Sequence, residues 1–385
     1  MVTITKPTIV HLTPFFHPNI GGVETHLLDL TSELSLLKYQ NIVLTYSPLT
    51  TNVIFKNFEK INKYLTIYRY PWIGKNLFNY FEKHPLINFL YLTPYLFLRT
   101  LIWFLKNPKP DIIHSHGINA AFIGFFIQKI FNIKTHIVSI YSTYDNVPLN
   151  NIYFKIIAYL LNNTNQVLTQ SNKSISQLIN LGINKSKISR YRHWVDLNRF
   201  KPMDKKNIRQ QLSLPNRITI LFIGRLIPPK NVISLAKICH YFPNCNFIFI
   251  GEGPDYKKLK QISLSNPNMY ILGNVPYSKL HFYYNSADIF CFPSKYDEGW
   301  GRVIMESIAC GTPVIASNLG AIPEVIDNSV SLLLTPSSKN IKNTLSSILS
   351  NKKHLKKITL NCRNYANQNF SKKNIDLITR FYVKT

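Results

Sequence analysis

Short apolar runs alternate with amphipathic stretches of helical period along the whole chain. The first run, residues 8–12, ends in a loop with Pro14 and Pro18, and Gly21-Gly22 follows. Apolar residues then recur at helical spacing, at Val23, Leu27, Leu30, Leu34 and Leu37. A short apolar run, a glycine turn and an amphipathic helix together predict one βα unit with a buried strand.

The same pattern continues through both halves of the chain. In the first half the strand candidates are residues 111–114, 135–140 and 166–169, and an apolar helix is predicted at 120–131. In the second half the strand candidates are residues 217–223, 246–250, 269–272, 287–292 and 313–317. This alternation predicts an α/β protein with two doubly wound, Rossmann-like sheets, whose ligands bind at the carboxyl ends of the strands.

Two domains and a terminal segment are expected. The polar, lysine-rich residues 202–215 separate the two patterns. We therefore predict an N-terminal domain at 1–200, a C-terminal domain at 201–365, and a last segment at 366–385.

Composition and charge narrow the function classes. The 385 residues are 45% hydrophobic, which excludes disorder as the main state. Lys and Arg number 45 against 18 Asp and Glu, a net charge of +27 that favours nucleic acid, a phosphate-bearing small molecule or an anionic membrane. No zinc finger, basic recognition helix or RNA-binding aromatic motif is present, so no nucleic-acid partner is expected.

Cysteine usage and the first residues favour a cytoplasmic protein. The five cysteines include no CxxC pair, which argues against a disulfide framework or a zinc site. Residues 1–7 lack the apolar core of a signal peptide.

The loop and helix after residues 287–292 carry candidate chemistry. Ser294 precedes a glycine-containing turn, Gly299-Trp300-Gly301, and a helix that ends near Gly311. Backbone N–H groups at such a helix start bind anions such as a diphosphate. Two carboxylates eight residues apart, Glu298 and Glu306, could both face that ligand and accept hydrogen bonds from sugar hydroxyls. Spacing alone fits equally well a capped helix with two solvated glutamates.

The segment from Glu298 to Glu306 resembles the E-x7-E motif of the retaining GT-B glycosyltransferases of family 4. Its continuation, Cys310-Gly311-Thr312-Pro313, resembles the same domain. The other motifs that resemble this family in order are Pro14-Phe15-Phe16-His17-Pro18 with Gly21-Gly22-Val23-Glu24, Asp111-Ile112-Ile113-His114-Ser115-His116, Ile223-Gly224-Arg225-Leu226 with Lys230, Gly251-Glu252-Gly253-Pro254, and Leu272-Gly273-Asn274-Val275. The resemblance covers nearly the whole chain and implies a GT-B fold, with two Rossmann-like domains facing each other across a cleft.

The resemblance assigns a phosphate-binding role to four residues. Arg225 and Lys230 would hold the donor diphosphate and stabilise the leaving nucleoside diphosphate. The backbone of Gly21 and Gly22 would approach the same phosphates from the other domain. Without the resemblance, these would be two surface cations and a plain βα turn.

Further roles concern the sugar and the nucleoside. Glu306 would bind the ribose, Glu298 a donor-sugar hydroxyl, and Val275 and Ser294 would lie near the base. His116 would orient or stabilise the donor sugar, whereas His114 would pack in the sheet. The implied catalytic residues are thus His116, Glu298, Arg225 and Lys230, with Gly299, Trp300 and Gly301 in the donor loop.

The implied chemistry requires no metal and no cofactor besides the nucleotide sugar. No Asp-x-Asp sequence occurs, which argues against the metal-dependent GT-A class. The resemblance implies a front-face mechanism that depends on positioning and electrostatic stabilisation. Two loops depart from the family pattern and affect the acceptor side, residues 141–145 and residues 193–196.

Residues 86–105 form the most apolar long stretch, with Pro94 and Arg99 inside it. Aromatic and apolar residues flanked by lysines are typical of a helix at the surface of an anionic membrane. A helix buried in the N-terminal domain explains the same pattern. We expect peripheral association with the cytoplasmic face of a membrane and a lipid-linked acceptor.

The sequence therefore predicts a retaining glycosyltransferase that moves a hexose, of mannose, glucose or N-acetylglucosamine type, from a GDP- or UDP-linked donor. The acceptor would be a glycan or a lipid-linked molecule in polysaccharide, glycolipid or N-glycan assembly. The alternatives are a non-catalytic sugar-nucleotide binder or an epimerase on the same fold, and a basic nucleic-acid-binding protein.

Overall fold

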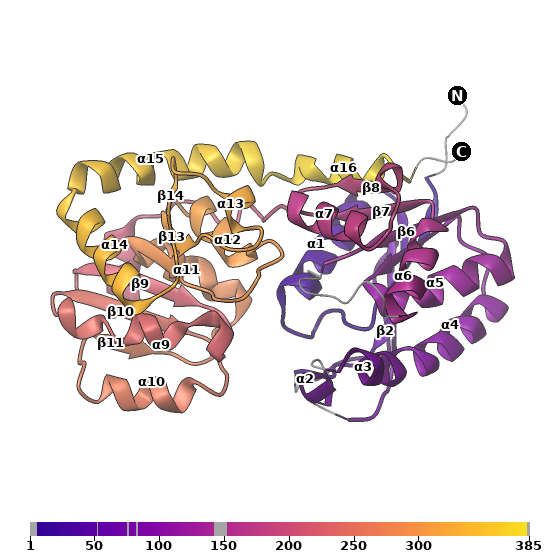
Figure 1. The fold of residues 1–385 in the computed structure, drawn as a ribbon, viewed down its shortest axis with the longest axis horizontal. Helices are drawn as coiled ribbons and strands as arrows, with labels where there is room; N and C mark the ends of the chain where they lie inside the picture. The colour runs from indigo at the N-terminus through magenta and orange to yellow at the C-terminus, as the bar shows by residue number, and fades with distance from the viewer. Residues whose placement is uncertain (1–5, 52, 75–76, 82–83, 142–151, 383–385) are drawn as a thin grey trace. The chain divides into compact units, whose positions relative to one another are not determined.

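Two compact α/β units make up the chain (Figure 1). The computed structural model describes residues 6–51, 53–74, 77–81, 84–141 and 152–382. The first unit comprises Met1–Tyr191 and Lys373–Thr385, and the second comprises Arg192–Lys372.

The first unit contains an eight-stranded sheet in the order β3-β4-β2-β1-β5-β6-β7-β8. All neighbouring pairs are parallel except β3 and β4. The strands are β1 (Thr8–Leu12), β2 (Gln40–Tyr46), β3 (Phe58–Asn62), β4 (Leu65–Tyr70), β5 (Ile112–His116), β6 (Thr135–Ser139), β7 (Gln166–Thr169) and β8 (Ile188–Arg190). The central strands are buried along nearly their whole length, as expected for a parallel sheet covered on both faces.

The first unit also contains helices. They are α1 (Gly22–Leu36), α2 (Leu77–Phe81), α3 (Pro85–Leu92), α4 (Pro94–Lys106), α5 (Ile118–Phe131), α6 (Ile152–Asn162), α7 (Asn172–Asn180) and α16 (Asp376–Thr379), with short 3-10 turns at η1 (Lys185–Lys187) and η5 (Lys372–Ile375). The apolar stretch around residues 86–105 forms α3 and α4. Leu92, Leu96 and Trp103 pack into the core beside α5, whereas Leu90 and Leu98 are exposed. This stretch is therefore buried on one side only.

The second unit contains a six-stranded, all-parallel sheet in the order β11-β10-β9-β12-β13-β14. Its strands are β9 (Ile218–Ile223), β10 (Cys245–Ile250), β11 (Met269–Ile271), β12 (Ile289–Phe292), β13 (Val314–Ser317) and β14 (Ser331–Leu334). Its helices are α8 (Lys205–Gln211), α9 (Val232–Ala236), α10 (Tyr256–Ser263), α11 (Leu280–Ser286), α12 (Arg302–Ala309), α13 (Ile322–Val325), α14 (Ser338–Ser350) and α15 (Lys352–Asn369), with 3-10 turns at η2 (Pro228–Lys230), η3 (Cys239–Tyr241) and η4 (Tyr277–Lys279). All five cysteines are buried in this unit and free.

The division between the units lies before Arg192, earlier in the chain than the sequence pattern suggests. Val195 and Phe200 are completely buried in the core of the second unit. The backbone N–H of Val195 also donates to the carbonyl of Phe370, 3.1 Å away. Residues 192–200 therefore belong to the second unit, as do residues 366–372, while the chain from Lys373 onward belongs to the first unit.

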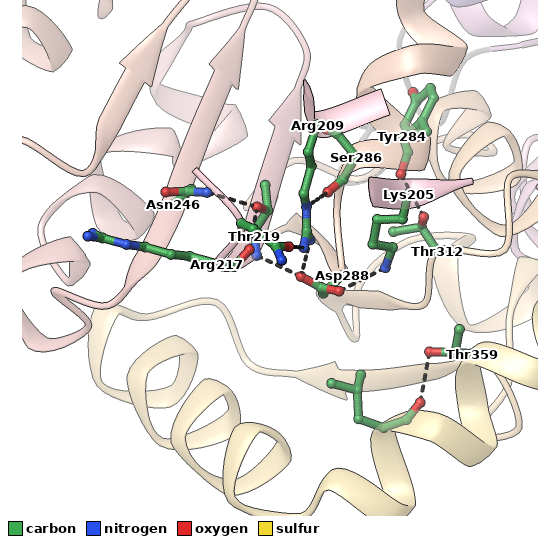
Figure 2. Close-up of polar contacts among 12 residues, drawn as sticks. Lys205, Arg209, Arg217, Thr219, Asn246, Tyr284, Ser286, Asp288, Thr312 and Thr359 are labelled. Carbon is green, nitrogen blue, oxygen red and sulfur yellow. Dashed lines mark hydrogen bonds and ion pairs between the residues drawn. The ribbon is translucent and has the colours of Figure 1, made fainter. Parts of the chain in front are cut away.

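Asp288 joins three elements of the second unit at the amino-terminal side of its sheet (Figure 2). Its carboxylate accepts from Lys205 Nζ at 2.8 Å, from the Arg209 guanidinium, and from the backbone N–H of Thr219 at 2.8 Å. Arg209 is itself buried, and its Nε donates to the carbonyl of Ser286 at 2.9 Å. Asp288 thus ties α8 to the starts of β9 and β12.

Replacing Asp288 with alanine is expected to destabilise the second unit. The buried charge of Arg209 loses its partner, which typically costs about 3–5 kcal/mol. Urea unfolding followed by circular dichroism measures this loss. The matched control is Lys257→Ala, which removes an exposed lysine from the same unit and is expected to cost under about 0.5 kcal/mol. An Asp288→Ala variant as stable as the control would contradict this role.

Candidate active site

Lys230 and Glu298 meet at the carboxyl ends of β9 and β12. Lys230 ends the turn η2 after β9, and its Nζ forms an ion pair with Glu298 Oε1. The side chains are 13% and 11% exposed. The backbone N–H of Lys295 donates to the carbonyl of Pro229 at 2.7 Å, which fastens the two loops together. The second unit therefore brings a cation and a carboxylate into contact although they are distant in sequence.

The loop after β12 holds Glu298 in place. The hydroxyl of Ser294, a completely buried residue, donates to Glu298 Oε1 at 2.7 Å. The backbone N–H of Ala321 donates to the Glu298 carbonyl at 3.0 Å. A Cβ atom on Gly320 would lie 2.8 Å from the backbone of Glu298, so only glycine fits against this loop.

Arg225 lies on the exposed surface of the loop after β9. This loop packs against the loop after β10 through backbone atoms. A Cβ atom on Gly251 would lie 1.9 Å from the carbonyl oxygen of Gly224, and Gly251 has φ +137. Glycine at 251 therefore permits the close approach that supports the Arg225 loop.

Glu306 lies on α12 and is almost completely buried. Its carboxylate accepts hydrogen bonds from Tyr277 at 3.1 Å, from Tyr284 at 3.0 Å, and from Arg302 Nε at 3.0 Å. Burial raises the pKa of Glu306, and the positive charge of Arg302 and these hydrogen bonds oppose that rise. A ligand that uses Glu306 would therefore meet a carboxylate that already has partners.

These three partners of Glu306 were not predicted from the sequence. Arg302 stands four residues before Glu306, a spacing that places both on one helix face. Its guanidinium also donates to the hydroxyl of Tyr277 at 2.8 Å. Helical spacing could have indicated Arg302, whereas no local signal points to Tyr277 or Tyr284.

The donor loop reaches α12 through Gly299, Trp300 and Gly301. Gly301 is the N-cap with φ +68, a left-handed conformation that favours glycine. Trp300 is buried beside His193, with ring centroids 6.2 Å apart. Burial, together with the nearby charge of Arg302, lowers the pKa of His193 to about 3. Val275 is half-buried against the core of the same unit.

Gly21 and Gly22 lie at the start of α1 in the first unit. Gly21 is the N-cap, with an extended φ of 179, and Gly22 is the first helical residue. Apart from its chain neighbours and its own helix backbone, no heavy atom of the described residues lies within 4 Å of a Cβ built on Gly22. Neither backbone conformation requires glycine, although a Cβ atom on Gly21 would lie 2.1 Å from the Glu24 carboxylate.

His116 ends β5 and is buried in a group of polar side chains in the first unit. Its Nε2 lies 3.1 Å from His11 Nδ1, and its Nδ1 lies 2.8 Å from the hydroxyl of Tyr141. His114 is completely buried, and its ring nitrogens lie 2.6 Å from the Tyr382 hydroxyl and 2.8 Å from the Ser139 hydroxyl. Burial, reinforced by neighbouring histidines, lowers the pKa of His114 and His116 well below the usual value.

His11, His114 and His116 form one group whose ligand atoms lie within 4.8 Å of one another. Neutral imidazoles are suitable zinc ligands. All six ring nitrogens of this group, however, have hydrogen-bond partners. A cation at this place would have to replace several of these hydrogen bonds, so we assign it no metal.

Of the loops that depart from the family pattern, residues 142–145 lie outside the described residues. Tyr141, at the start of that loop, contacts His116 as given above.

Comparison with known proteins identifies the family of this chain. Residues 20–199 match the family described as Glycosyltransferase Family 4, and residues 204–365 match Glycosyl transferases group 1. The chain is 25% identical over 342 residues to the phosphatidylinositol N-acetylglucosaminyltransferase GPI3 subunit of Saccharomyces cerevisiae, covering 84% of this chain and 71% of that protein. It is 24% identical over 386 residues to an uncharacterised glycosyltransferase of Methanocaldococcus jannaschii, covering 95% of both.

Solved structures have the same fold. Sucrose-phosphate synthase from Thermosynechococcus elongatus matches with a TM-score of 0.80 at 19% identity, over 97% of this chain and 98% of that chain. HepE from Anabaena, in complex with UDP-glucose, matches with a TM-score of 0.76 at 17% identity, over 97% and 98%. Two Rossmann-like units, together with these family matches, identify a GT-B glycosyltransferase. The chain belongs to group 1 of these enzymes, in glycosyltransferase family 4.

Proposed function

We propose that this glycosyltransferase transfers a hexose from a nucleoside diphosphate sugar with retention of configuration, and that the second unit binds the donor. The contact between Lys230 and Glu298 is the observation that carries the proposal. A nucleotide sugar presents a diphosphate directly beside hydroxyl groups. A lysine and a carboxylate held side by side, at the carboxyl ends of parallel strands, match that pair of groups.

Each donor group has a partner in this proposal. Lys230 and Arg225 bind the diphosphate and stabilise the charge that develops on it as the sugar leaves. Glu298 accepts hydrogen bonds from the sugar, and Glu306 from the ribose. Ser294, Val275 and the turn Gly299–Gly301 line the donor site. Gly21 and Gly22 approach the phosphates, and His116 contacts the sugar. No metal or further cofactor is required.

A panel of sugar nucleotides tests the proposal. Thermal unfolding and donor hydrolysis are measured with GDP-mannose, UDP-glucose and UDP-N-acetylglucosamine. One donor is expected to raise Tm, since a ligand at 100 times its Kd stabilises a protein by about 2.7 kcal/mol. That result would identify both base and sugar. A Tm that no sugar nucleotide changes at millimolar concentration would contradict donor binding.

We further propose a lipid-linked acceptor and peripheral association with the cytoplasmic face of a membrane. The GPI3 subunit named above is a phosphatidylinositol N-acetylglucosaminyltransferase, which supports a glycolipid acceptor. Among the described residues, the stretch Leu86–Lys106 is long and apolar enough to cross a membrane, with a mean hydropathy of 1.3, and 28% of its most apolar window is buried. Large apolar side chains are exposed on this stretch, at Leu86, Ile87, Leu90, Leu98 and Leu105.

The membrane proposal predicts binding to vesicles that contain phosphatidylglycerol. We expect co-sedimentation at low salt and release at high salt, because exposed lysines attract anionic lipid. Leu90→Asp is expected to weaken binding. The matched control is Leu264→Asp in the second unit, where an equally large side chain is 88% exposed. Equal binding by both variants, or none by the unaltered protein, would contradict the proposal.

A further inference from the structure

One face of the first sheet contains a continuous chain of polar side chains. It runs from Asn41 on β2 through His11 on β1 and His116 on β5 to Tyr141, which follows β6. Successive polar atoms lie 3.1 Å apart between Asn41 Oδ1 and His11 Nε2, 3.1 Å apart between His11 Nδ1 and His116 Nε2, and 2.8 Å apart between His116 Nδ1 and the Tyr141 hydroxyl. Asn41 and both histidines are buried.

The amide of Asn41 fixes the direction of the first hydrogen bond. Its Nδ2 donates to two backbone carbonyls, that of Tyr39 at 2.7 Å and that of Tyr64 at 3.3 Å. A carbonyl can only accept, so the nitrogen must point toward these two groups and Oδ1 toward His11. Oδ1 is itself an acceptor, so His11 must donate from Nε2.

The remaining directions follow one by one. Burial lowers the pKa of His11 to about 4, although the bond to Asn41 opposes this, so the ring is neutral at pH 7 and carries its one proton on Nε2. His11 Nδ1 is then an acceptor, and His116 must donate from Nε2. His116 is also neutral, because burial and the neighbouring His114, His11 and His26 oppose a positive charge there. Its Nδ1 therefore accepts the hydrogen bond from Tyr141.

We propose that Asn41 and His11 are positioning residues that hold His116 as a neutral imidazole protonated on Nε2, so that its Nδ1 accepts a hydrogen bond from a hydroxyl group. In this structure that hydroxyl belongs to Tyr141. In turnover, a sugar or acceptor hydroxyl takes its place. An unprotonated Nδ1 binds a hydroxyl, and it repels a phosphate or carboxylate oxygen. The binding of a substrate hydroxyl to His116 rests on the proposed function, whereas the tautomer of His116 does not.

The tautomer of His116 can be measured directly in the unaltered protein by NMR, with the histidine side chains labelled with ¹⁵N. The signals of two of its 11 histidines are assigned by their loss in His116→Gln and His11→Gln. At neutral pH we expect Nδ1 of His116 to be unprotonated and Nε2 to be protonated. The opposite tautomer would overturn the proposal, as would one bound zinc ion per chain. This result is independent of whether any glycosyl transfer is found.

Asn41→Asp is expected to reverse the direction of these hydrogen bonds, and it tests whether the tautomer of His116 affects kcat. A carboxylate beside His11 favours the doubly protonated form of this histidine, which donates to the new carboxylate and to His116 Nε2. The proton of His116 then moves to Nδ1, which becomes a donor. We expect kcat to fall by about tenfold or more at neutral pH, with the donor KM little changed, and to recover as pH rises and His11 becomes neutral.

His136→Gln is the matched control. His136 is as deeply buried in the same sheet, but it bonds to Ser115 at 2.9 Å on the side that packs against α5. We expect this variant to keep the tautomer of His116 and the pH profile of kcat. An unchanged tautomer in Asn41→Asp, or a reversed tautomer with unchanged kcat, would overturn the proposal. A reversed tautomer in His136→Gln would do the same.

Discussion

Replacing Lys230 with methionine is expected to reduce kcat/KM for the sugar nucleotide by about 10²–10³. Methionine keeps the length of the side chain and removes its charge. Lys230 lies against Glu298 and the Phe292 ring, with Nζ 5.1 Å from the ring centroid, so its position is well defined before a donor binds. The loss would come from the missing positive charge beside the departing diphosphate.

Two further variants distinguish the effect of losing the Lys230 charge from the effect of a change in structure. Lys237→Met removes an exposed lysine from the same unit and is expected to change kcat/KM less than about twofold. Glu298→Gln keeps the hydrogen bond from Ser294 while removing the charge that pairs with Lys230. We expect it to lower kcat while the nucleoside diphosphate still binds. Lys230→Met with unaltered turnover would contradict a role of Lys230 in stabilising the departing diphosphate.

The first unit is expected to unfold in mild acid because it buries several neutral histidines. Burial lowers the pKa of His11 to about 4 and that of His136 to about 3, and it lowers those of His114 and His116 in the same direction. The unfolded chain binds protons below about pH 6.5, whereas the folded chain binds them only at lower pH. Stability is thus complete above about pH 6.5 and decreases as the pH falls toward the folded values.

The size of this effect is large relative to the stability of a domain. Between pH 7.5 and pH 5, a histidine with folded pKa near 4 or below lowers the free energy of unfolding by about 2 kcal/mol. His11 and His136 together contribute about 4 kcal/mol, and domains are stable by about 5–15 kcal/mol. Urea titrations at several pH values should show a steep loss between about pH 6.5 and 5.

The dependence on pH should decrease when one buried histidine is removed. His136→Gln is expected to reduce the slope of unfolding free energy against pH by about 1.4 kcal/mol per pH unit in this range. His84→Gln, at an exposed position of the same unit, is the matched control. A stability that does not change from pH 7.5 to pH 5 would show that these histidines are protonated in the folded protein.

Several strands with strongly apolar sequences were predicted, whereas the apolar strands β2 and β14 were not. β1, β7 and β12 lie within the predicted runs, because a strand buried on both faces needs apolar residues at nearly every position. β4 was not predicted, because Arg69 interrupts its apolar pattern. In the structure this arginine is buried, with Nη1 2.8 Å from Glu59 Oε2 and Nη2 2.9 Å from the His17 carbonyl. Its partners come from other segments, so the local sequence does not reveal that it can be buried.

The sequence by itself determined the alternation of strands and helices, the family and the positions of the motifs, since these depend on local spacing. Only the tertiary structure decided which motif residues touch: Lys230 with Glu298, Glu306 with Tyr277 and Tyr284, and His116 with His11. These contacts join residues far apart in the chain. They depend on strand order and register, which place β1 beside β5 and β9 beside β12. The protonation of His116 depends on the same order, because burial and its neighbours set it.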